Sequence, residues 1–344
     1  MRNLVPADST WKHGYASKAP QFAIIFHGRE IPGWSRRGFV AAGRGVGMYP
    51  GAFAYHRAKS YSEAVSQLSE LGEDAKFLAG GQSLIPLMKL RLSTPRHLVD
   101  LNFIPETSYI HGNGALRIGA LTRHSQIAAS LDAAQIPILR DCATGIADPQ
   151  VRHMGTIGGS LAEADPTGDW APVLLATGAT VKTLGASGER SIDISEFILD
   201  AFHSALQHGE LVTEIAVPLP NKRSGGAYIA LKRCAPVYAS ASVAVQLALH
   251  DDDSCKDARI YLGVLGLTAT RVPAAEEALQ DRQIDAGLLQ TVREAVMDTA
   301  EPTSDMRGSA DYKREVAGTL AKLALQAAVR RARGEHVEVT HLYA

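Results

Sequence analysis

Two glycine pairs, each flanked by small or hydroxyl-bearing residues, are the segments of this sequence best suited to bind a ligand. The first is Ala79-Gly80-Gly81-Gln82-Ser83, and the second is Thr156-Ile157-Gly158-Gly159-Ser160. Glycine has no Cβ, so such a segment can adopt positive φ, turn several N–H groups toward one point and let an anion approach the main chain. A single Gly-Gly is more often an ordinary turn. The matching flanks favour a pair of loops that together hold a diphosphate, with the serine hydroxyls as additional donors.

An acidic segment follows the second glycine pair. Asp169 directly precedes Trp170 and the apolar run from Ala171 to Ala176, which predicts a helix. An acid at this position caps a helix N-terminus, and a carboxylate beside a phosphate loop also accepts hydrogen bonds from the hydroxyls of a sugar or sugar alcohol. The two roles are compatible, and the sequence leaves both open.

The sequence lacks the common catalytic and nucleotide-binding motifs. No G-x-G-x-x-G opens a βαβ unit, and there is no G-x-x-x-x-G-K-[ST], G-x-S-x-G or H-E-x-x-H. The three cysteines, Cys142, Cys234 and Cys255, are widely spaced, which excludes a disulfide framework and an iron–sulfur cluster held by this chain alone. We therefore predict no catalytic residue and no metal ligand, and any dinucleotide must be held by other means.

Composition is that of a soluble globular protein of two domains. The 344 residues are 46% hydrophobic and 21% charged, and no apolar run is long enough to span a bilayer. Thirty-five basic and 36 acidic residues give a net charge of −1, so no overall positive field attracts a nucleic acid. We expect neither a nucleic-acid partner nor a membrane span.

Apolar periodicity predicts short alternating helices and strands in the first part of the chain and a different pattern after Tyr228. The expected helices span residues 61–71, 84–92, 122–130, 274–279, 288–297 and 311–333, and the expected strands span 76–79, 97–101, 116–120, 243–249 and 259–267. Ser83 and Thr122 are expected to cap the second and third of these helices. Prolines and glycines concentrate between Pro218 and Gly226. This boundary divides the chain into two α+β domains, residues 48–222 and 223–335.

The first 47 residues differ from the rest and predict a poorly ordered extension. They carry seven basic residues against two acidic ones, with no sustained helical or strand period. Ser35-Arg36-Arg37-Gly38-Phe39-Val40 looks like a twin-arginine export signal, but no apolar segment of sufficient length follows it. We therefore expect a cytoplasmic protein and favour Met48 as the true start.

Three separate motifs, in order, resemble those of the FAD-binding medium subunits of the molybdenum hydroxylases. They are residues 78–92, which contain the first glycine pair, residues 156–170, which contain the second, and Asp305-Met306-Arg307-Gly308-Ser309 with the five residues after it. The sequence is similar to the aerobic carbon monoxide dehydrogenase medium subunit and, more distantly, to the flavin domain of xanthine dehydrogenase. The resemblance runs from about Met48 to about Arg333.

The resemblance implies an α+β fold: a two-subdomain PCMH-type FAD-binding domain, as in vanillyl-alcohol oxidase, plus a smaller C-terminal α+β domain. It implies FAD as cofactor, with Ala79 to Ser83 and Thr156 to Ser160 at the diphosphate. Asp169 matches an acidic cofactor contact, and Val212 and Lys232 match positions near the flavin. It also implies a hetero-oligomer with a small iron–sulfur subunit and a large molybdenum-pterin subunit, in which this chain passes electrons through FAD to an external acceptor.

The sequence departs from the family pattern at three places. Gln82 stands where many relatives have histidine, and Ser160 where many have asparagine. The segment Cys234-Ala235-Pro236-Val237-Tyr238 replaces one that usually carries glycine and aspartate before an aromatic residue, although Tyr238 still offers a ring. Two other readings stay open: a stand-alone flavin-dependent oxidase of the same fold, and a structural subunit with a vestigial flavin site. The oxidised substrate and the final acceptor are also open.

Overall fold

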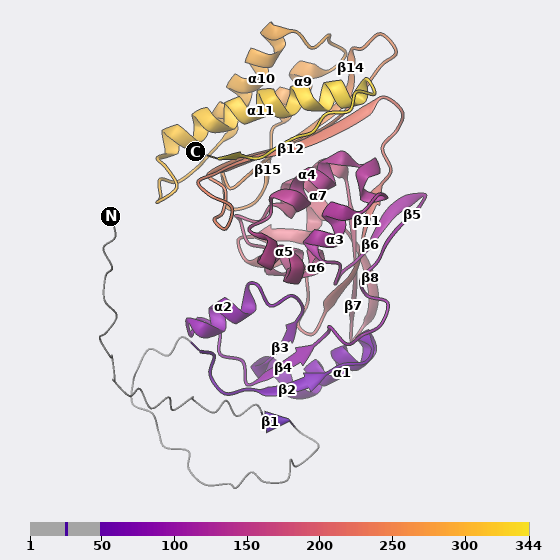
Figure 1. Ribbon diagram of the computed structural model, residues 1–344, viewed down its shortest axis with the longest axis vertical. Helices are drawn as coiled ribbons and strands as arrows, with labels where there is room; N and C mark the ends of the chain where they lie inside the picture. The colour runs from indigo at the N-terminus through magenta and orange to yellow at the C-terminus, as the bar shows by residue number, and fades with distance from the viewer. Residues whose placement is uncertain (1–24, 27–48, 344) are drawn as a thin grey trace, which may run out of the picture.

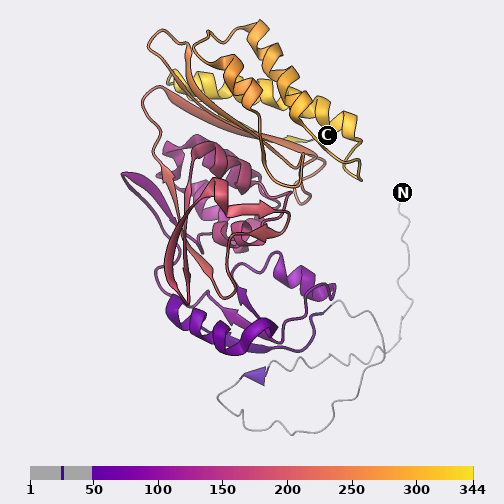
Figure 2. The same ribbon diagram turned by 180° about the vertical axis from the view of Figure 1, so that it is seen from behind.

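The computed structural model describes residues 25–26 and 49–343, which form three stacked tiers (Figure 1). Seen from behind, the tiers keep the same order along the long axis (Figure 2). The predicted N-terminal extension, residues 1–47, lies outside the described residues except for the two-residue strand β1 (Ile25–Phe26). In the described part of the chain, no helix combines the length and apolarity needed to cross a bilayer.

The first tier is a small parallel sheet with one long helix packed on it. Its strand order is β1-β2-β4-β3, with β2 (Ala54–Arg57), β3 (Ala75–Leu78) and β4 (His97–Asp100). Helix α1 (Tyr61–Leu71) begins at Ser60, whose side chain accepts a hydrogen bond from the Glu63 N–H group, and it buries Ala64, Val65 and Leu68 against the sheet. A short 3₁₀ turn, η1 (Gly72–Asp74), precedes β3, and α2 (Leu84–Lys89) follows the first glycine pair.

The second tier is an antiparallel sheet whose core is completed by short helices. The strand order is β5-β6-β11-β7-β8, with β5 (Ile110–Asn113), β6 (Ala115–Gly119), β7 (Thr180–Gly185), β8 (Gly188–Asp193) and β11 (Leu211–Pro218). The helical elements are α3 (His124–Ala129), η2 (Ala133–Gln135), α4 (Pro137–Gly145), α5 (Pro149–Met154), α6 (Ile157–Glu163), α7 (Trp170–Thr177) and α8 (Ile194–Phe197). A two-stranded ribbon, β9 (Ile198–Asp200) with β10 (His203–Ser204), follows α8.

The third tier is a second five-stranded sheet covered by the C-terminal helices. Its strand order is β15-β14-β13-β12-β16, with β12 (Ser224–Lys232), β13 (Ala241–Leu249), β14 (Cys255–Gly263), β15 (Thr270–Arg271) and β16 (Leu342–Tyr343). The helices are α9 (Pro273–Leu279), α10 (Ala286–Thr299) and α11 (Ala310–Ala332). The long helix α11 lies across the sheet in both views (Figures 1 and 2).

Strand β12 joins the second and third tiers because both of its faces are buried. Ala227 and Ile229 pack into the core under α9–α11, whereas Tyr228 and Ala230 pack into the core shared with α4 and α7. Successive side chains of a strand point to opposite faces. A strand covered on both sides is therefore apolar at nearly every position, as the run from Ala227 to Leu231 is.

Most predicted elements agree with the structure, but the strand expected at residues 259–267 is displaced, because β14 spans Cys255–Gly263. The helix expected at residues 61–71 is α1, and the strand expected at 97–101 is β4. Thr122 was expected to cap α3, but Arg123 occupies the N-cap position and the Thr122 hydroxyl instead exchanges hydrogen bonds with the Tyr109 backbone. Ser83 precedes α2 without capping it through its side chain. For Thr122 a contact distant in sequence overrides the capping preference. For Ser83 the helical backbone angles do so.

Candidate functional site

A cavity of about 800 Å³ opens where the two glycine segments meet, between the first and second tiers. The structure brings together at this cavity all the predicted site residues except Ile157: Ala79, Gly80, Gly81, Gln82, Ser83, Thr156, Gly158, Gly159, Ser160, Asp169, Val212 and Lys232. The side chain of Ile157 is fully buried in the second-tier core. The first turn of α6 directs this side chain away from the cavity, and a place for Ile157 in the cofactor site stays a prediction.

The two glycine segments lie side by side, although they are far apart in the sequence: a Cβ added at Gly159 would lie 3.6 Å from the Ala79 Cβ. A Cβ added at Gly80 would lie 2.3 Å from the Met154 carbonyl oxygen, and one added at Gly158 would lie 2.6 Å from the Ala120 Cβ. The expected reason for these two glycines was close approach of a ligand. The structure instead shows that the protein's own backbone and Ala120 occupy the space that a side chain would need.

The free backbone donors belong to the first segment. The N–H groups of residues 80–84 have no hydrogen-bond partner among the described residues. In the second segment, by contrast, the N–H groups of Ile157 and Gly158 bond the Thr122 and Ala120 carbonyls, and that of Gly159 bonds the Thr156 hydroxyl. Gly81, the second residue of the free row, has a φ of +71°, which turns the chain there. A row of unpaired main-chain donors at a cavity fits an anionic ligand such as a diphosphate.

Two polar residues that the sequence reading missed hold the segments in register. The Asn102 amide donates to the Ala79 carbonyl (2.9 Å), and its oxygen accepts from the Arg123 guanidinium. Arg123 also donates to the Met154 carbonyl (2.8 Å), just before the second segment. These residues follow β4 and precede α3, and nothing in their local spacing marks them. Only the pairing of the tiers makes them neighbours.

The opposite wall of the cavity carries a carboxylate and an ammonium group. The Tyr228 hydroxyl donates to Asp169 (2.6 Å), and the Lys232 Nζ lies 3.7 Å from the same carboxylate while donating to the Gly145 carbonyl (2.6 Å). Burial, together with Asp169, raises the pKa of Tyr228 well above its ordinary value, so the hydroxyl stays a donor. Asp169 occupies the N-cap position of α7 but makes no side-chain cap bond. Asp169 is also one of the residues that line the cavity.

The end of the chain supports this wall from behind. His341 bonds the Asp141 carbonyl through Nε2 (2.7 Å) and the Ala230 N–H group through Nδ1 (3.3 Å). Its ring occupies the space that a Cβ on Gly145 would fill, and Gly145 is the residue whose carbonyl holds Lys232. Strand β16 pairs with β12 at the same level. The last described residues therefore help to place the ammonium group.

Several other cavity-lining residues were not identified from the sequence. They are the turn before β11 (residues 206–211), the acids Glu163 and Asp165, and His124. Pro236, Val237 and Tyr238 line the cavity at its rim, so the Tyr238 ring considered above does reach the site. Partial burial, and then the Asp165 carboxylate, raise the pKa of Tyr238 to about 12. In the described part of the chain, no three His, Cys, Asp or Glu side chains are grouped to bind a metal ion.

His124 makes the stability of this site dependent on pH. Its Nδ1 accepts a hydrogen bond from the Trp170 indole (3.1 Å), and burial, followed by the charges of Arg123 and Arg152, lowers its pKa to about 4. The unfolded chain has the ordinary pKa of about 6.5. The stabilisation is therefore complete above about pH 6.5 and is lost as the pH falls toward 4. We expect the free energy of unfolding to fall by about 2 kcal/mol from this group between about pH 7 and pH 5.

Replacing His124 with asparagine, which keeps an acceptor for the indole, should remove this part of the pH dependence. Urea unfolding of both proteins at the two pH values measures it. If the free energy of unfolding of His124→Asn falls between pH 7 and pH 5 as much as that of the wild type, another group is responsible for the pH dependence. His153, which is exposed and bonds the Pro149 carbonyl, provides a control substitution that should leave the dependence intact.

Two consecutive parts of the chain match known protein families. Residues 51–220 match the family described as "FAD binding domain in molybdopterin dehydrogenase", and residues 226–328 match "CO dehydrogenase flavoprotein C-terminal domain". The carbon monoxide dehydrogenase medium chain of Afipia carboxidovorans is 40% identical over 288 residues, which cover 83% of this chain and all of that relative. Subunit alpha of the 6-hydroxypseudooxynicotine dehydrogenase complex of Paenarthrobacter nicotinovorans is 37% identical over 86% of this chain and all of that relative.

A solved structure shows the same fold. The carbon monoxide dehydrogenase of Hydrogenophaga pseudoflava, in a form that lacks the Mo-pyranopterin moiety, contains a chain that is 39% identical and superposes with a TM-score of 0.79. The superposition covers 82% of this chain and 99% of that one. The α+β architecture expected from the sequence, an FAD-binding domain followed by a C-terminal domain, is thereby confirmed.

Proposed function

Because the chain belongs to the FAD-binding medium subunits of carbon monoxide dehydrogenase and related molybdenum hydroxylases, we propose that it passes electrons through FAD within a complex of three kinds of subunit. The electrons come from iron–sulfur clusters on a small partner chain, which receive them from a molybdenum-pterin centre on a large partner chain. An external acceptor then takes them up. The observation that supports this proposal best is that residues 80–84, whose N–H groups are free, line the cavity of a chain whose cofactor is FAD.

The residues of this chain bind and orient the cofactor in this proposal. The N–H groups of residues 80–84 bind the diphosphate, and Ser160 offers a hydroxyl from the second segment. Asp169 accepts hydrogen bonds from sugar or ribityl hydroxyls, and Lys232 and Val212 lie toward the flavin. When bound, FAD supplies a centre that takes up and releases electrons singly or in pairs. No side chain of this subunit has to act as acid, base or nucleophile in the first oxidation.

Domain limits and location are part of the same proposal. We assign the FAD-binding domain to residues 48–222 and the C-terminal domain to residues 223–335. We place the complex in the cytoplasm, because the twin-arginine-like segment at residues 35–40 lacks the apolar run that export requires. The two relatives described above are subunits of dehydrogenases named for quite different substrates, so this chain leaves the substrate class open.

Purifying the tagged full-length chain from its own cells, together with whatever it binds, tests the proposal. We expect a smaller and a larger chain to co-purify, with the visible absorbance of both flavin and iron–sulfur clusters. Carbon monoxide, an aldehyde and an N-heterocycle are then added separately without oxygen. One of them should bleach the flavin in the complex and none should bleach it in the FAD-loaded chain alone. Bleaching of the isolated chain would support the stand-alone oxidase instead, and a chain without partners or flavin would support the vestigial subunit.

A further inference from the structure

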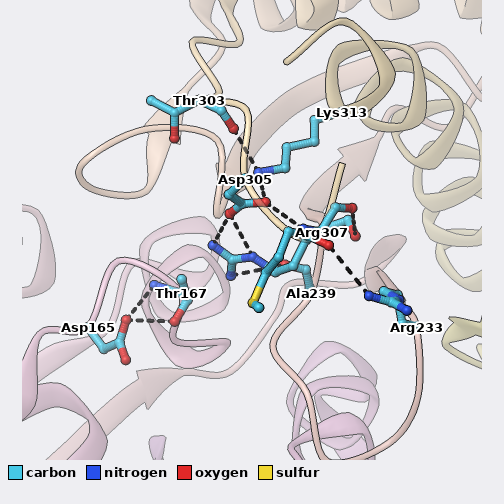
Figure 3. A network of polar contacts seen from close by, with 10 residues as sticks. Asp165, Thr167, Arg233, Ala239, Thr303, Asp305, Arg307 and Lys313 are labelled. Carbon is cyan, nitrogen blue, oxygen red and sulfur yellow. Dashed lines mark hydrogen bonds and ion pairs between the residues drawn. The ribbon is translucent and has the colours of Figure 1, made fainter. Parts of the chain in front are cut away.

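A loop of the third tier is organised around the carboxylate of Asp305. This carboxylate accepts hydrogen bonds from the Arg307 guanidinium (2.9 and 2.6 Å), from the Arg307 N–H group (2.8 Å) and from the Lys313 Nζ (2.8 Å). Figure 3 shows the Arg307 and Lys313 side chains turned toward Asp305. Lys313 is almost fully buried and also donates to the Thr303 carbonyl (2.8 Å). These bonds give the loop of residues 303–309 a fixed shape.

This loop contacts both ends of the segment that rims the cavity, residues 233–240. At one end the Arg233 guanidinium donates to the Met306 carbonyl (3.5 Å). At the other end the Ser240 hydroxyl donates to the Arg307 carbonyl (3.0 Å), and Arg307 donates to the Ala239 carbonyl (3.5 Å). Figure 3 shows Arg307 between Asp305 and these two ends of the rim. Residues 236–238, which lie between the two ends, line the cavity.

The rim segment has little support of its own. Its base is closed by the bond from the Ser240 N–H group to the Leu231 carbonyl (2.8 Å), and a single internal turn bond joins the Val237 N–H group to the Cys234 carbonyl (3.3 Å). Two adjacent residues in the middle of the segment are exposed to solvent, Val237 by 36% and Tyr238 by 53%. The Tyr238 hydroxyl also interacts with the Asp165 carboxylate. A segment whose ends make so few contacts is mobile there unless something outside it holds those ends. The contacts from residues 303–309 are the ones that reach both of its ends.

We propose that Arg307 is a positioning residue of the cofactor site: held by Asp305, which Lys313 fixes in turn, it keeps residues 233–240 closed over the cavity and so sets how tightly FAD is retained. This inference rests on the proposed function for the identity of what lies beneath the rim. Neither Asp305, Arg307 nor Lys313 lines the cavity. The loop of residues 303–309 therefore acts on the site only through the rim segment. The proposed positioning also gives the Asp305–Arg307 motif a role in the family resemblance.

The assembled complex carrying Arg307→Ala tests this role through the release of FAD. The rate is followed as the rise of flavin fluorescence after dilution, and the exposure of bound flavin is measured by iodide quenching. We expect release to be about tenfold faster and quenching to increase, because the charge-assisted bond to the Ala239 carbonyl is lost together with the bonds to Asp305 that fix the supporting loop. Arg307→Lys, which keeps a cation for Asp305, should restore most of the wild-type rate. A residue that only stabilised the fold would not change iodide access to the flavin.

Arg293→Ala is the matched control. Arg293 pairs with Glu315 on the same tier and its side chain is 24% exposed, as is that of Arg307, but it does not contact the rim. It should release FAD at the wild-type rate. Should Arg307→Ala fail to fold, Ser240→Ala removes the single hydroxyl bond to the Arg307 carbonyl and should speed release about threefold.

The inference would be overturned if the folded variants Arg307→Ala or Ser240→Ala released FAD at the wild-type rate. It would also be overturned if Arg293→Ala accelerated FAD release as much as they do. The outcome is separable from the proposed electron transfer. If Arg307→Ala releases FAD faster while no substrate bleaches the wild-type flavin, the positioning role stands and the electron-transfer proposal fails. If a substrate bleaches the wild-type flavin but the variants release FAD at the wild-type rate, the electron-transfer proposal stands and the positioning role of Arg307 fails.

Discussion

Replacing Gly81 with valine should lower the affinity of the assembled complex for FAD by about 100-fold. Gly81 has a φ of +71°, and a β-branched residue there costs about 1–2 kcal/mol in backbone strain. Its Cβ would also lie 3.1 Å from the Ile85 side chain. Relief of that strain moves the free N–H groups of residues 80–84. The loss of two charge-assisted hydrogen bonds, at about 1.5 kcal/mol each, gives about two powers of ten in affinity. Titration of the flavin-depleted complex with FAD measures the change.

Gly114→Val is the matched control for backbone strain. Gly114 has a φ of +70°, sits in the turn between β5 and β6, and has no atom within 4 Å of an added Cβ. It should lose similar stability while keeping its FAD affinity. Equal affinity in Gly81→Val and the wild type would show that the first glycine segment does not hold the diphosphate. Gly158 is a poorer test, because a Cβ there would lie 2.8 Å from the Ala120 carbonyl oxygen and would disturb the fold as well.

Replacing Arg331 with alanine should reduce the free energy of unfolding by about 3–5 kcal/mol, because it leaves the Asp141 carboxylate buried and uncompensated. Arg331 on α11 and Asp141 on α4 form a bidentate pair (2.6 and 2.9 Å), and their side chains are only 7% and 6% exposed. The guanidinium also donates to the Gly226 and Val337 carbonyls. Burial raises the pKa of Asp141 even though Arg331 lowers it, so the pair joins the tiers at a considerable desolvation cost.

The adjacent Arg330 provides the control for this prediction. It pairs with Glu335 at the surface, where the two side chains are 54% and 45% exposed. Arg330→Ala should change the free energy of unfolding by no more than about 1 kcal/mol. Urea unfolding of both variants distinguishes the two cases. A loss of less than about 1 kcal/mol in Arg331→Ala would mean that the second and third tiers are not coupled through this pair.

The sequence allowed the local parts of the fold to be predicted because they depend on neighbouring residues. The apolar face of residues 61–71 and the serine before it define α1 without reference to the rest of the chain. Gly81 was recognised for the same reason, since a positive φ requires only the residues of the turn. Gly80 and Gly158, by contrast, have to be glycines because distant parts of the chain pack against them. Capping predictions were less successful. Thr122 and Asp169 bond Tyr109 and Tyr228 respectively, partners that no local pattern reveals.

What the sequence determined by itself, then, is where the main chain can turn, which faces are apolar and which residues can offer a charge. Only the tertiary structure decided which of these groups meet. It left the N–H groups of residues 80–84 free while pairing those of Ile157 and Gly158, and it brought Asn102 and Arg123 to the two glycine segments. The physical reason is that backbone conformation is set over a few residues, whereas the partner of a donor or a charge depends on which distant segments fold against it.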